Sequence, residues 1–348
     1  MMKTIELKTP SMEGKIYIGR EAVETRLPLL TAGQKNFVLT DTNVYALYAD
    51  WFKQYFADAE IFVLPAGEEN KNFHSLQAIL EKMAGAGMRR NARLFAVGGG
   101  VIGDIGGLCA ALYMRGIDYV QIPTTLLAQV DSGVGGKTAV DLGGVKNVIG
   151  AFYQPCEVLI DPAFLSTLPD REIKCGFGEI VKYAALSGEV FDLLENHRAR
   201  WTDLAFLENL IPLCVEYKAR VVERDEKETG ERRSLNIGHT TGHAIELSTG
   251  LSHGESVLYG MLLETKMAIS AGVCEKAYGE KLSSLVKAAI AVEPTERVDF
   301  TQLSQVAEKA RFDKKNTEED KITMAVAKGK GEWTTLALPF EEYKKSLF

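Results

Sequence analysis

Three of the chain's five histidines, His239, His243 and His253, lie within a stretch of fifteen residues. Neutral imidazole is the commonest protein ligand for zinc and similar ions, so this density indicates a metal site. His239 and His243 are four residues apart and would share one face of a helix, which suits metal binding. Clustered histidines also occur without a metal, so the remaining sequence has to decide. The candidates for a further ligand are His253, Glu246, Glu255 and the distant Glu179.

The spacing of the first two histidines also tests for a protease. A zinc protease with two histidines four residues apart has a glutamate directly after the first one, where it acts as the general base. Here that position is Thr240. The sequence therefore disfavours proteolysis.

A run of glycines, Gly98-Gly99-Gly100-Val101-Ile102-Gly103, fits the spacing Gly-X-Gly-X-X-Gly between an apolar run and a helix-like segment at 103–113. Such glycines let the backbone approach a pyrophosphate at a helix N-terminus. The run departs from the standard fingerprint because it is not in the first strand–helix unit and no acidic residue ends the next strand, 119–123. A purely structural turn is the alternative. Asp104 would suit a ribose or the nicotinamide end, because a carboxylate repels a pyrophosphate.

Residues 131–141, continuing to Lys146 and Asn147, are rich in glycine and polar side chains. We expect them to be too polar for a buried strand and to offer cations and amide donors to an anionic substrate. Gly136-Lys137-Thr138 resembles the end of a phosphate-binding loop, but the earlier glycine of that motif is missing. Nucleotide hydrolysis is therefore disfavoured.

The elements that must position these residues differ between the two halves of the chain. Apolar runs at 15–18, 36–40, 61–64 and 94–97 alternate with helix-like segments, which predicts a mainly parallel sheet covered by helices. Ligands of such sheets bind beyond the carboxyl ends of the strands. Polar or glycine-rich clusters follow three of these runs, at 41–43, 67–71 and from Gly98.

Beyond residue 169 the periodicity becomes helical. The segments 172–195, 201–224, 255–271 and 278–292 are amphipathic, whereas 322–338 could form a late β-hairpin. The predicted fold is a Rossmann-like α/β N-terminal domain at 1–169, with a mainly parallel sheet, and a mostly α-helical C-terminal domain at 170–348. We expect the first to bind NAD and the second to bind metal and substrate, with the active site in the cleft between them.

Length and composition limit the possible functions. A chain of 348 residues exceeds what one hydrophobic core usually supports, so two domains are expected. The net charge of -7 argues against nucleic acid as the main partner. No apolar run is long enough for a membrane span or a secretory signal. The five cysteines are odd in number and widely spaced, which favours a reducing, cytoplasmic location.

Taken in order, these motifs resemble the 3-dehydroquinate synthases of the sugar-phosphate cyclase superfamily, from about residue 41 to about residue 315. The resemblance rests on the following stretches: 98–107 with Asp104, 113–116, 123–131, 135–137, 146–147 with 150–155, Glu179 with Lys182 and Tyr183, and the histidine region. So many motifs in one order are highly specific.

The resemblance implies a lyase of the shikimate pathway, which leads to chorismate and the aromatic amino acids. It would convert 3-deoxy-D-arabino-heptulosonate 7-phosphate to 3-dehydroquinate and phosphate. The steps would be transient oxidation by NAD, phosphate elimination, re-reduction, ring opening and an intramolecular aldol closure. The cofactors would be NAD and one divalent metal ion, zinc or cobalt, in a cytoplasmic homodimer.

The resemblance also assigns residues. The implied metal ligands are Glu179, His239 and His253, which leaves His243 to relay a proton or hydrogen-bond beside the substrate. The implied NAD-binding residues are Asp41, Asn43, Glu68, Lys71, Gly98, Gly99, Gly100, Asp104, Thr124, Thr125, Lys146 and Thr167. The implied substrate-binding residues are Arg115, Asp131, Lys137, Asn147, Lys182, Lys218, Arg232, Asn236 and, from the pair at 314–315, Lys314. Those expected to take part in catalysis are His243, Lys137, Lys182, Asn147, Arg232 and Asn236.

Three alternatives stay open. Another NAD- and metal-dependent sugar-phosphate cyclase would share the cofactors, but Arg232, Asn236 and His243 favour a carboxylate-bearing substrate. A metal-dependent polyol dehydrogenase would release NADH and would have no use for six substrate-facing cations. A non-catalytic protein stabilised by metal and nucleotide would not need Lys137, His243 or Arg232. A small sugar phosphate is thus the expected partner, with neither nucleic acid nor membrane.

Overall fold

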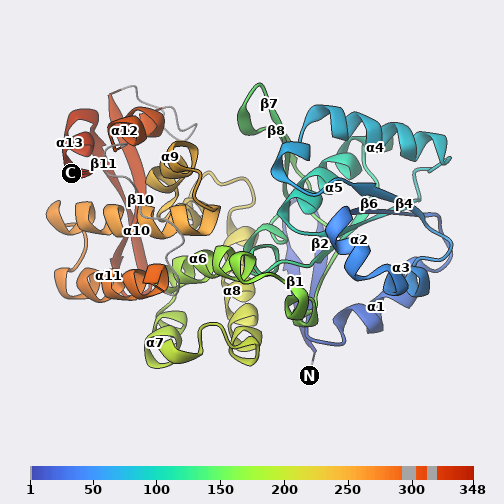
Figure 1. Ribbon diagram of the computed structural model, residues 1–348, viewed down its shortest axis with the longest axis horizontal. Helices are drawn as coiled ribbons and strands as arrows, with labels where there is room; N and C mark the ends of the chain where they lie inside the picture. The colour runs from blue at the N-terminus through green and yellow to red at the C-terminus, as the bar shows by residue number, and fades with distance from the viewer. Residues whose placement is uncertain (1, 292–302, 312–319) are drawn as a thin grey trace. The chain divides into compact units, whose positions relative to one another are not determined.

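The computed structural model describes residues 2–291, 303–311 and 320–348 (Figure 1). The chain divides into two compact units. The first unit comprises Met1–Ile173 together with Ile211–Lys227, and the second comprises Lys174–Leu210 and Glu228–Phe348. The domain boundary after residue 169 and the active site in a cleft stay predictions.

The first unit contains a sheet of seven strands in the order β1-β2-β9-β6-β5-β3-β4. The strands are β1 (Lys3–Lys8), β2 (Glu13–Ile18), β3 (Asn36–Asp41), β4 (Glu60–Leu64), β5 (Arg93–Gly98), β6 (Asp118–Pro123) and β9 (Glu157–Ile160). Only the β1–β2 pair is antiparallel among them. The expected mainly parallel sheet is confirmed, because each apolar run named above lies on one of these strands.

The central strands of this sheet are buried on both faces, as expected where helices cross over between parallel strands. Along β5, Leu94 and Ala96 pack toward α4 (Phe73–Gly85) and α5 (Gly100–Leu112). Phe95 and Val97 face the opposite core, with α1 (Ala22–Thr31) and α3 (Ala49–Tyr55). Figure 1 shows the two helical layers on either side of the strands. The central strands are therefore packed from both sides, which positions the residues at their ends.

The structure corrects the prediction for residues 131–141. After the short η3 helix (Ala128–Ser132), residues of β7 (Lys137–Leu142) pair with β8 (Val145–Phe152) in an antiparallel hairpin. Thr138 to Val140 are buried, because Gly107 on α5 leaves room for the Thr138 methyl group. The polar composition of the segment gave no indication that residues 138–140 are buried, because their packing partner, Gly107, lies about thirty residues earlier in the chain.

Helices dominate the second unit. They are α6 (Asp170–Leu186, which begins in the first unit), α7 (Gly188–Asn196), α9 (His239–Thr249), α10 (His253–Ser270), α11 (Lys276–Ala291), α12 (Leu303–Arg311) and α13 (Phe340–Ser346). The long α8 (Leu204–Arg224) belongs to both units. The predicted helix at 172–195 is interrupted at Ser187, whose hydroxyl caps α7 by accepting a bond from the Val190 N–H.

The late hairpin predicted at 322–338 is present as β10 (Lys321–Gly329) and β11 (Glu332–Pro339). Helices α9 to α13 pack around it. The described parts of the chain contain no helix that is both long and apolar enough to cross a lipid bilayer. All five cysteines are free thiols, and four of them are buried.

Candidate functional site

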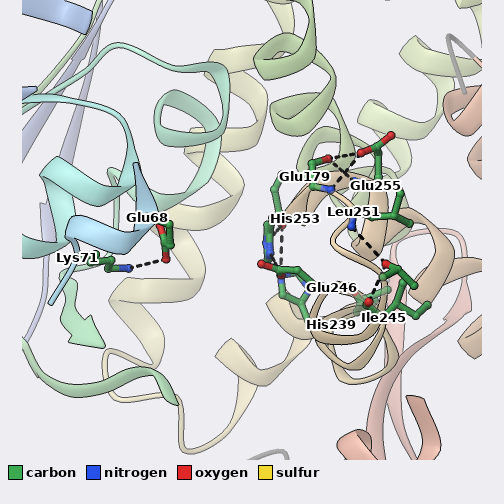
Figure 2. A network of polar contacts seen from close by, with 12 residues as sticks. Glu68, Lys71, Glu179, His239, Ile245, Glu246, Leu251, His253 and Glu255 are labelled. Atoms are coloured by element: carbon green, nitrogen blue, oxygen red, sulfur yellow. Dashed lines mark hydrogen bonds and ion pairs between the residues drawn. The ribbon is translucent and has the colours of Figure 1, made fainter. Parts of the chain in front are cut away.

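Three side chains from different helices converge in the second unit. Glu179 lies on α6, His239 begins α9 and His253 begins α10. The Nε2 atoms of His239 and His253 lie 3.2 and 3.1 Å from one oxygen of Glu179, Oε1. One potential ligand atom from each residue lies within 4.8 Å of the others. Figure 2 shows the two imidazoles directed at the carboxylate.

The hydrogen bonds of the Nδ1 atoms orient the rings of His239 and His253. The Nδ1 of His239 lies 3.1 Å from the Ile237 carbonyl oxygen, and the Nδ1 of His253 lies 3.0 Å from Glu246 Oε2. Both of these oxygens accept, so both Nδ1 atoms donate, and in a neutral ring the Nε2 atom is left with its lone pair. In that neutral form, two lone pairs and a carboxylate oxygen face one another, and a positive charge between them, either a metal ion or a proton on His253, makes the arrangement favourable. The residues present therefore fit a divalent metal ion.

Charge at the cluster supports the same conclusion. Burial raises the pKa of Glu179, but Lys182 and His239 outweigh it and hold that pKa well below its usual value. Burial lowers the pKa of His239 to about 4, which keeps it in the neutral, metal-binding form. Burial also lowers the pKa of His253, yet the carboxylates of Glu179 and Glu246 raise it overall to about 10. Glu179 and Glu246 thus stabilise a positive charge at His253 or directly beside it.

Two histidines and one glutamate form the ligand set of catalytic zinc sites, which keep a position open for water or substrate. Glu179 is fully buried whereas His253 is partly exposed, so one side of the cluster is accessible. The nitrogen and oxygen donors suit zinc or cobalt better than calcium, which takes six to eight oxygens.

Glu246 and Glu255, which the sequence offered as candidate ligands, have other roles in the structure. Glu246 lies behind His253 and holds its ring, as carboxylates commonly do for metal-binding histidines. Glu255 closes a capping box with Ser252 at the start of α10. The spacing Ser-X-X-Glu at 252–255 is itself the signature of that cap and could have identified this role from the sequence.

His243 lies next to the cluster. Its ring centroid is 5.3 Å from that of His239 and 5.8 Å from that of His253. The group of converging ligand atoms found among the described residues does not include it. The spacing of four residues therefore brings His243 near the two histidines, but the converging group consists of Glu179, His239 and His253. Its part in proton transfer stays a prediction.

Three other predicted site residues lie in the second unit. The Lys182 ammonium is buried and lies 2.5 Å from Glu179 Oε2. Arg232 and Asn236 lie on η6 (Glu231–Asn236), just before α9, and Asn236 donates to the carboxylate of Glu228. Glu228 has a left-handed backbone (φ 59°), which is rare for a residue other than glycine. The sequence offered no signal for Glu228.

Most predicted NAD residues lie at the carboxyl ends of adjacent strands in the first unit. Asp41 ends β3 and caps α2 (Thr42–Leu47), Gly98 ends β5, and Thr124 follows β6. The chain leaves β3 for β4 on one side and then returns to β5 on the other. The gap between the ends of β3 and β5 is therefore the switch point at which ligands bind in such sheets.

The glycine turn at this edge is tightly packed against neighbouring side chains, while Gly99 and Gly100 stay partly exposed. Helix α5 begins at Gly100, three residues earlier than predicted, and Gly99 precedes it without a side chain that could cap the helix. A Cβ at Gly98 would lie 2.7 Å from the Ile102 Cβ, and one at Gly99 would lie 3.0 Å from the Thr125 methyl group. A side chain at either position would collide with these neighbours, and a backbone without side chains at a helix N-terminus is what a pyrophosphate site requires.

Asp104 forms an ion pair beside this turn. Its carboxylate lies 2.5 Å from the Lys71 ammonium, which follows η1 (Glu68–Asn70), with Glu68 4.0 Å from the same lysine (Figure 2). Burial lowers the pKa of Lys71, but Asp104 and Glu68 outweigh it and raise that pKa overall. The pairing offsets the negative charge of Asp104, which was the objection to a carboxylate near a pyrophosphate.

The remaining NAD candidates are more scattered. Asn43 is in α2, and Lys146 is exposed on β8. Thr167 ends η4 (Pro162–Thr167), and its hydroxyl lies 2.6 Å from that of Tyr48. Their contact with NAD stays a prediction.

The substrate candidates of the first unit include one partly buried ion pair and two residues with left-handed backbones. Lys218 donates to Asp131 Oδ1 at 2.8 Å and to the Asp131 carbonyl at 2.7 Å. Arg115 and Asn147 have φ angles of 67° and 52°, and such conformations concentrate at functional sites. Lys137 is exposed at the start of β7. Lys314 lies outside the described residues.

Comparison with known proteins identifies the family. The 3-dehydroquinate synthase N-terminal model matches residues 61–175, and the C-terminal model of the same family matches 176–316. The chain is 42% identical over 323 residues to the 3-dehydroquinate synthase of Thermoanaerobacter sp. (strain X514), covering 90% of each chain. The chain belongs to the 3-dehydroquinate synthase family.

Two solved structures share the whole fold. A 2-deoxy-scyllo-inosose synthase in complex with carbaglucose-6-phosphate, NAD+ and Co2+ has a TM-score of 0.87 and 25% identity, and the match covers 99% of both chains. The 2-epi-5-epi-valiolone synthase of Streptomyces hygroscopicus subsp. jinggangensis 5008, with NAD+ and Zn2+ bound, has a TM-score of 0.81 and 26% identity. That match covers 97% of this chain and 96% of the other.

Proposed function

We propose that this chain is a phosphorus–oxygen lyase that converts 3-deoxy-D-arabino-heptulosonate 7-phosphate to 3-dehydroquinate and phosphate, as the name of its relatives implies. One observation carries the proposal. Glu179, His239 and His253 converge as an open metal-ligand set in a chain that is 42% identical to a 3-dehydroquinate synthase over most of its length. The product would enter the shikimate pathway toward chorismate.

The cofactors are NAD and one divalent metal ion. Similar structures hold NAD+ with Co2+ or with Zn2+, and both candidate sites here fit such groups. Glu179, His239 and His253 would hold the metal, and the ends of β3 to β6 would hold NAD. When bound, the metal lowers the pKa of substrate hydroxyls and NAD takes up and later returns a hydride.

The chain's own cations would bind the anionic ends of the substrate. Lys182 lies directly beside the metal ligands, and Arg232 is buried on η6, where a guanidinium suits bidentate binding of a carboxylate. In the first unit, Lys218 and Asp131 form a pair that can hold a charge and a hydroxyl group. These charges favour a substrate with both phosphate and carboxylate over an uncharged polyol.

His243 would handle a proton at one of its ring nitrogens. It lies next to the two histidine ligands, and an imidazole has the pKa for such a transfer near neutral pH. Asn147 and Lys137 would orient the substrate from the β7–β8 hairpin.

We also propose that the site forms in a cleft between the units, in a cytoplasmic homodimer. Sedimentation equilibrium tests the dimer, since a monomeric mass at micromolar concentration would contradict it.

A different sugar-phosphate cyclase is the nearest alternative, because two such enzymes share the fold. Their identity of 25–26% is well below the 42% shared with the 3-dehydroquinate synthase. A polyol dehydrogenase is the second alternative.

The experiment that tests the proposal is to incubate the protein with NAD, Zn2+ or Co2+ and the heptulosonate phosphate, and to measure phosphate, dehydroquinate and NADH together. Equal phosphate and dehydroquinate without net NADH support the proposal, and accumulating NADH or absent phosphate contradicts it.

The Lys71–Asp104 pair gives a test of the NAD site. Lys71→Met should weaken NAD binding about 10- to 100-fold, because a charged hydrogen bond is lost and a mostly buried carboxylate loses its partner. Adding Asp104→Asn should restore thermal stability without restoring affinity. Fluorescence titration with NAD and thermal melts check both. If the double variant bound NAD like the wild type, the pair would be purely structural.

A further inference from the structure

The start of α9 is held by a side chain from another helix. Gly238 precedes α9 in a left-handed conformation (φ 78°) and has no side chain with which to cap the helix. Glu264 on α10 takes over this function: its Oε2 accepts from the Gly238 N–H and its Oε1 accepts from the Thr241 N–H, both at 2.8 Å. A carboxylate at a helix N-terminus is favoured by the helix dipole as well as by these bonds.

Glu264 is about as buried as a charged residue can be, with 1% of its surface exposed. Around it the two helices are in direct backbone contact. A Cβ at Gly260 on α10 would overlap the Gly238 carbonyl oxygen and lie 2.7 Å from the Gly242 N–H nitrogen. A Cβ at Gly242 would lie 2.9 Å from the Ser256 carbonyl oxygen. The glycines set how closely α9 and α10 approach, and Glu264 fixes their register at the first turn of α9.

This register places the two histidine ligands. His239 is the first residue of α9, between the two N–H groups that Glu264 binds, and His253 is the first residue of α10, which also carries Glu264. Glu264 therefore ties one imidazole to the helix that carries the other. Any shift of the α9 start relative to α10 changes the separation of the Nε2 atoms that face Glu179.

We propose that Glu264 is a positioning residue that sets the geometry of the metal site. It lies outside the converging ligand group and acts through the backbone of α9. The proposal rests on the proposed function only in taking Glu179, His239 and His253 as the metal ligands. Residues that hydrogen-bond to metal ligands typically change metal affinity by about 10- to 100-fold when replaced, and we expect an effect of this size for Glu264.

The test measures Co2+ binding to metal-stripped protein, following both the dissociation constant and the visible absorption of the bound ion. Glu264→Gln keeps the shape but turns an NH2 group toward one of the two backbone N–H donors. We expect a dissociation constant raised about 10- to 100-fold and an altered Co2+ spectrum. Glu226→Gln is the matched control, because Glu226 is also buried and accepts from Ser11 and from Gln154 in the first unit. It should lower the melting temperature and leave Co2+ binding unchanged.

If Glu264→Gln does not fold, Glu264→Asp decides by the same criteria, because its shorter carboxylate cannot reach both donors. Wild-type affinity and spectrum in the folded variant would overturn the proposal, even if the melting temperature fell. A failure of the proposed ligand set is a separate result: the wild type would then bind no Co2+, or His253→Ala would bind it normally.

Discussion

Replacing His253 with alanine removes metal binding and activity together, whereas replacing His243 leaves the metal bound and lowers only the rate. His253 contributes one of three converging ligand atoms, and its loss should weaken metal binding by more than about 100-fold. His243 lies beside the cluster with its ring outside the converging group. Loss of an acid–base residue typically costs about 100- to 10,000-fold in turnover.

Metal content after dialysis and turnover at saturating Zn2+ or Co2+ measure the two effects separately. His74→Ala is the matched control, because this histidine is exposed on α4 in the first unit and should change neither quantity. Equal metal loss in the His243 and His253 variants would show that the ligands are assigned wrongly.

Glu179→Gln should abolish metal binding and also destabilise the metal-free protein. The Lys182 ammonium lies 2.5 Å from the Glu179 carboxylate, and both side chains are buried. Removing one member of a buried ion pair leaves the other charge uncompensated, at a cost of about 3–5 kcal/mol in the free energy of unfolding. Lys182→Met should behave differently: it should retain the metal ligands and lose activity, because a substrate-binding cation is gone.

The double variant Glu179→Gln with Lys182→Met separates stability from metal binding. Without the lysine charge the unfolding free energy in EDTA should recover most of the loss, while the metal stays unbound. Urea denaturation in EDTA and metal analysis provide both values. Metal binding by the double variant at wild-type affinity would remove Glu179 from the ligand set.

The fold could be predicted largely from local patterns. The inner strands β3, β5 and β6 are apolar runs that are buried almost throughout, so the local pattern indicates them. The β7–β8 hairpin was missed because its burial depends on Gly107, a contact that no local pattern encodes. The break at Ser187 was missed for a related reason: a cap ends one helix and starts the next without changing the hydrophobic periodicity.

For the site as well, local patterns predicted some features, and contacts between distant residues determined the others. Spacing favoured His239 with His243, because four residues make one helical turn, yet the structure brings His253 and Glu179 onto His239 instead. Glu179 lies sixty residues before His239; the residues alone offered it as one of four candidate ligands, and the resemblance to a family selected it. The supporting carboxylates Glu246 and Glu264 act through contacts between helices, so nothing in the sequence distinguishes them from other helical glutamates.

The central claim is that NAD acts as a catalyst in a lyase that makes a carbocycle. The most direct measurement is the amount of 3-dehydroquinate formed per NAD when the enzyme, loaded with Zn2+ or Co2+, carries substoichiometric NAD and excess heptulosonate phosphate. We predict many products per NAD, one phosphate per product and no accumulated NADH. A yield that stops at one product per NAD, with NADH left in solution, would contradict the account.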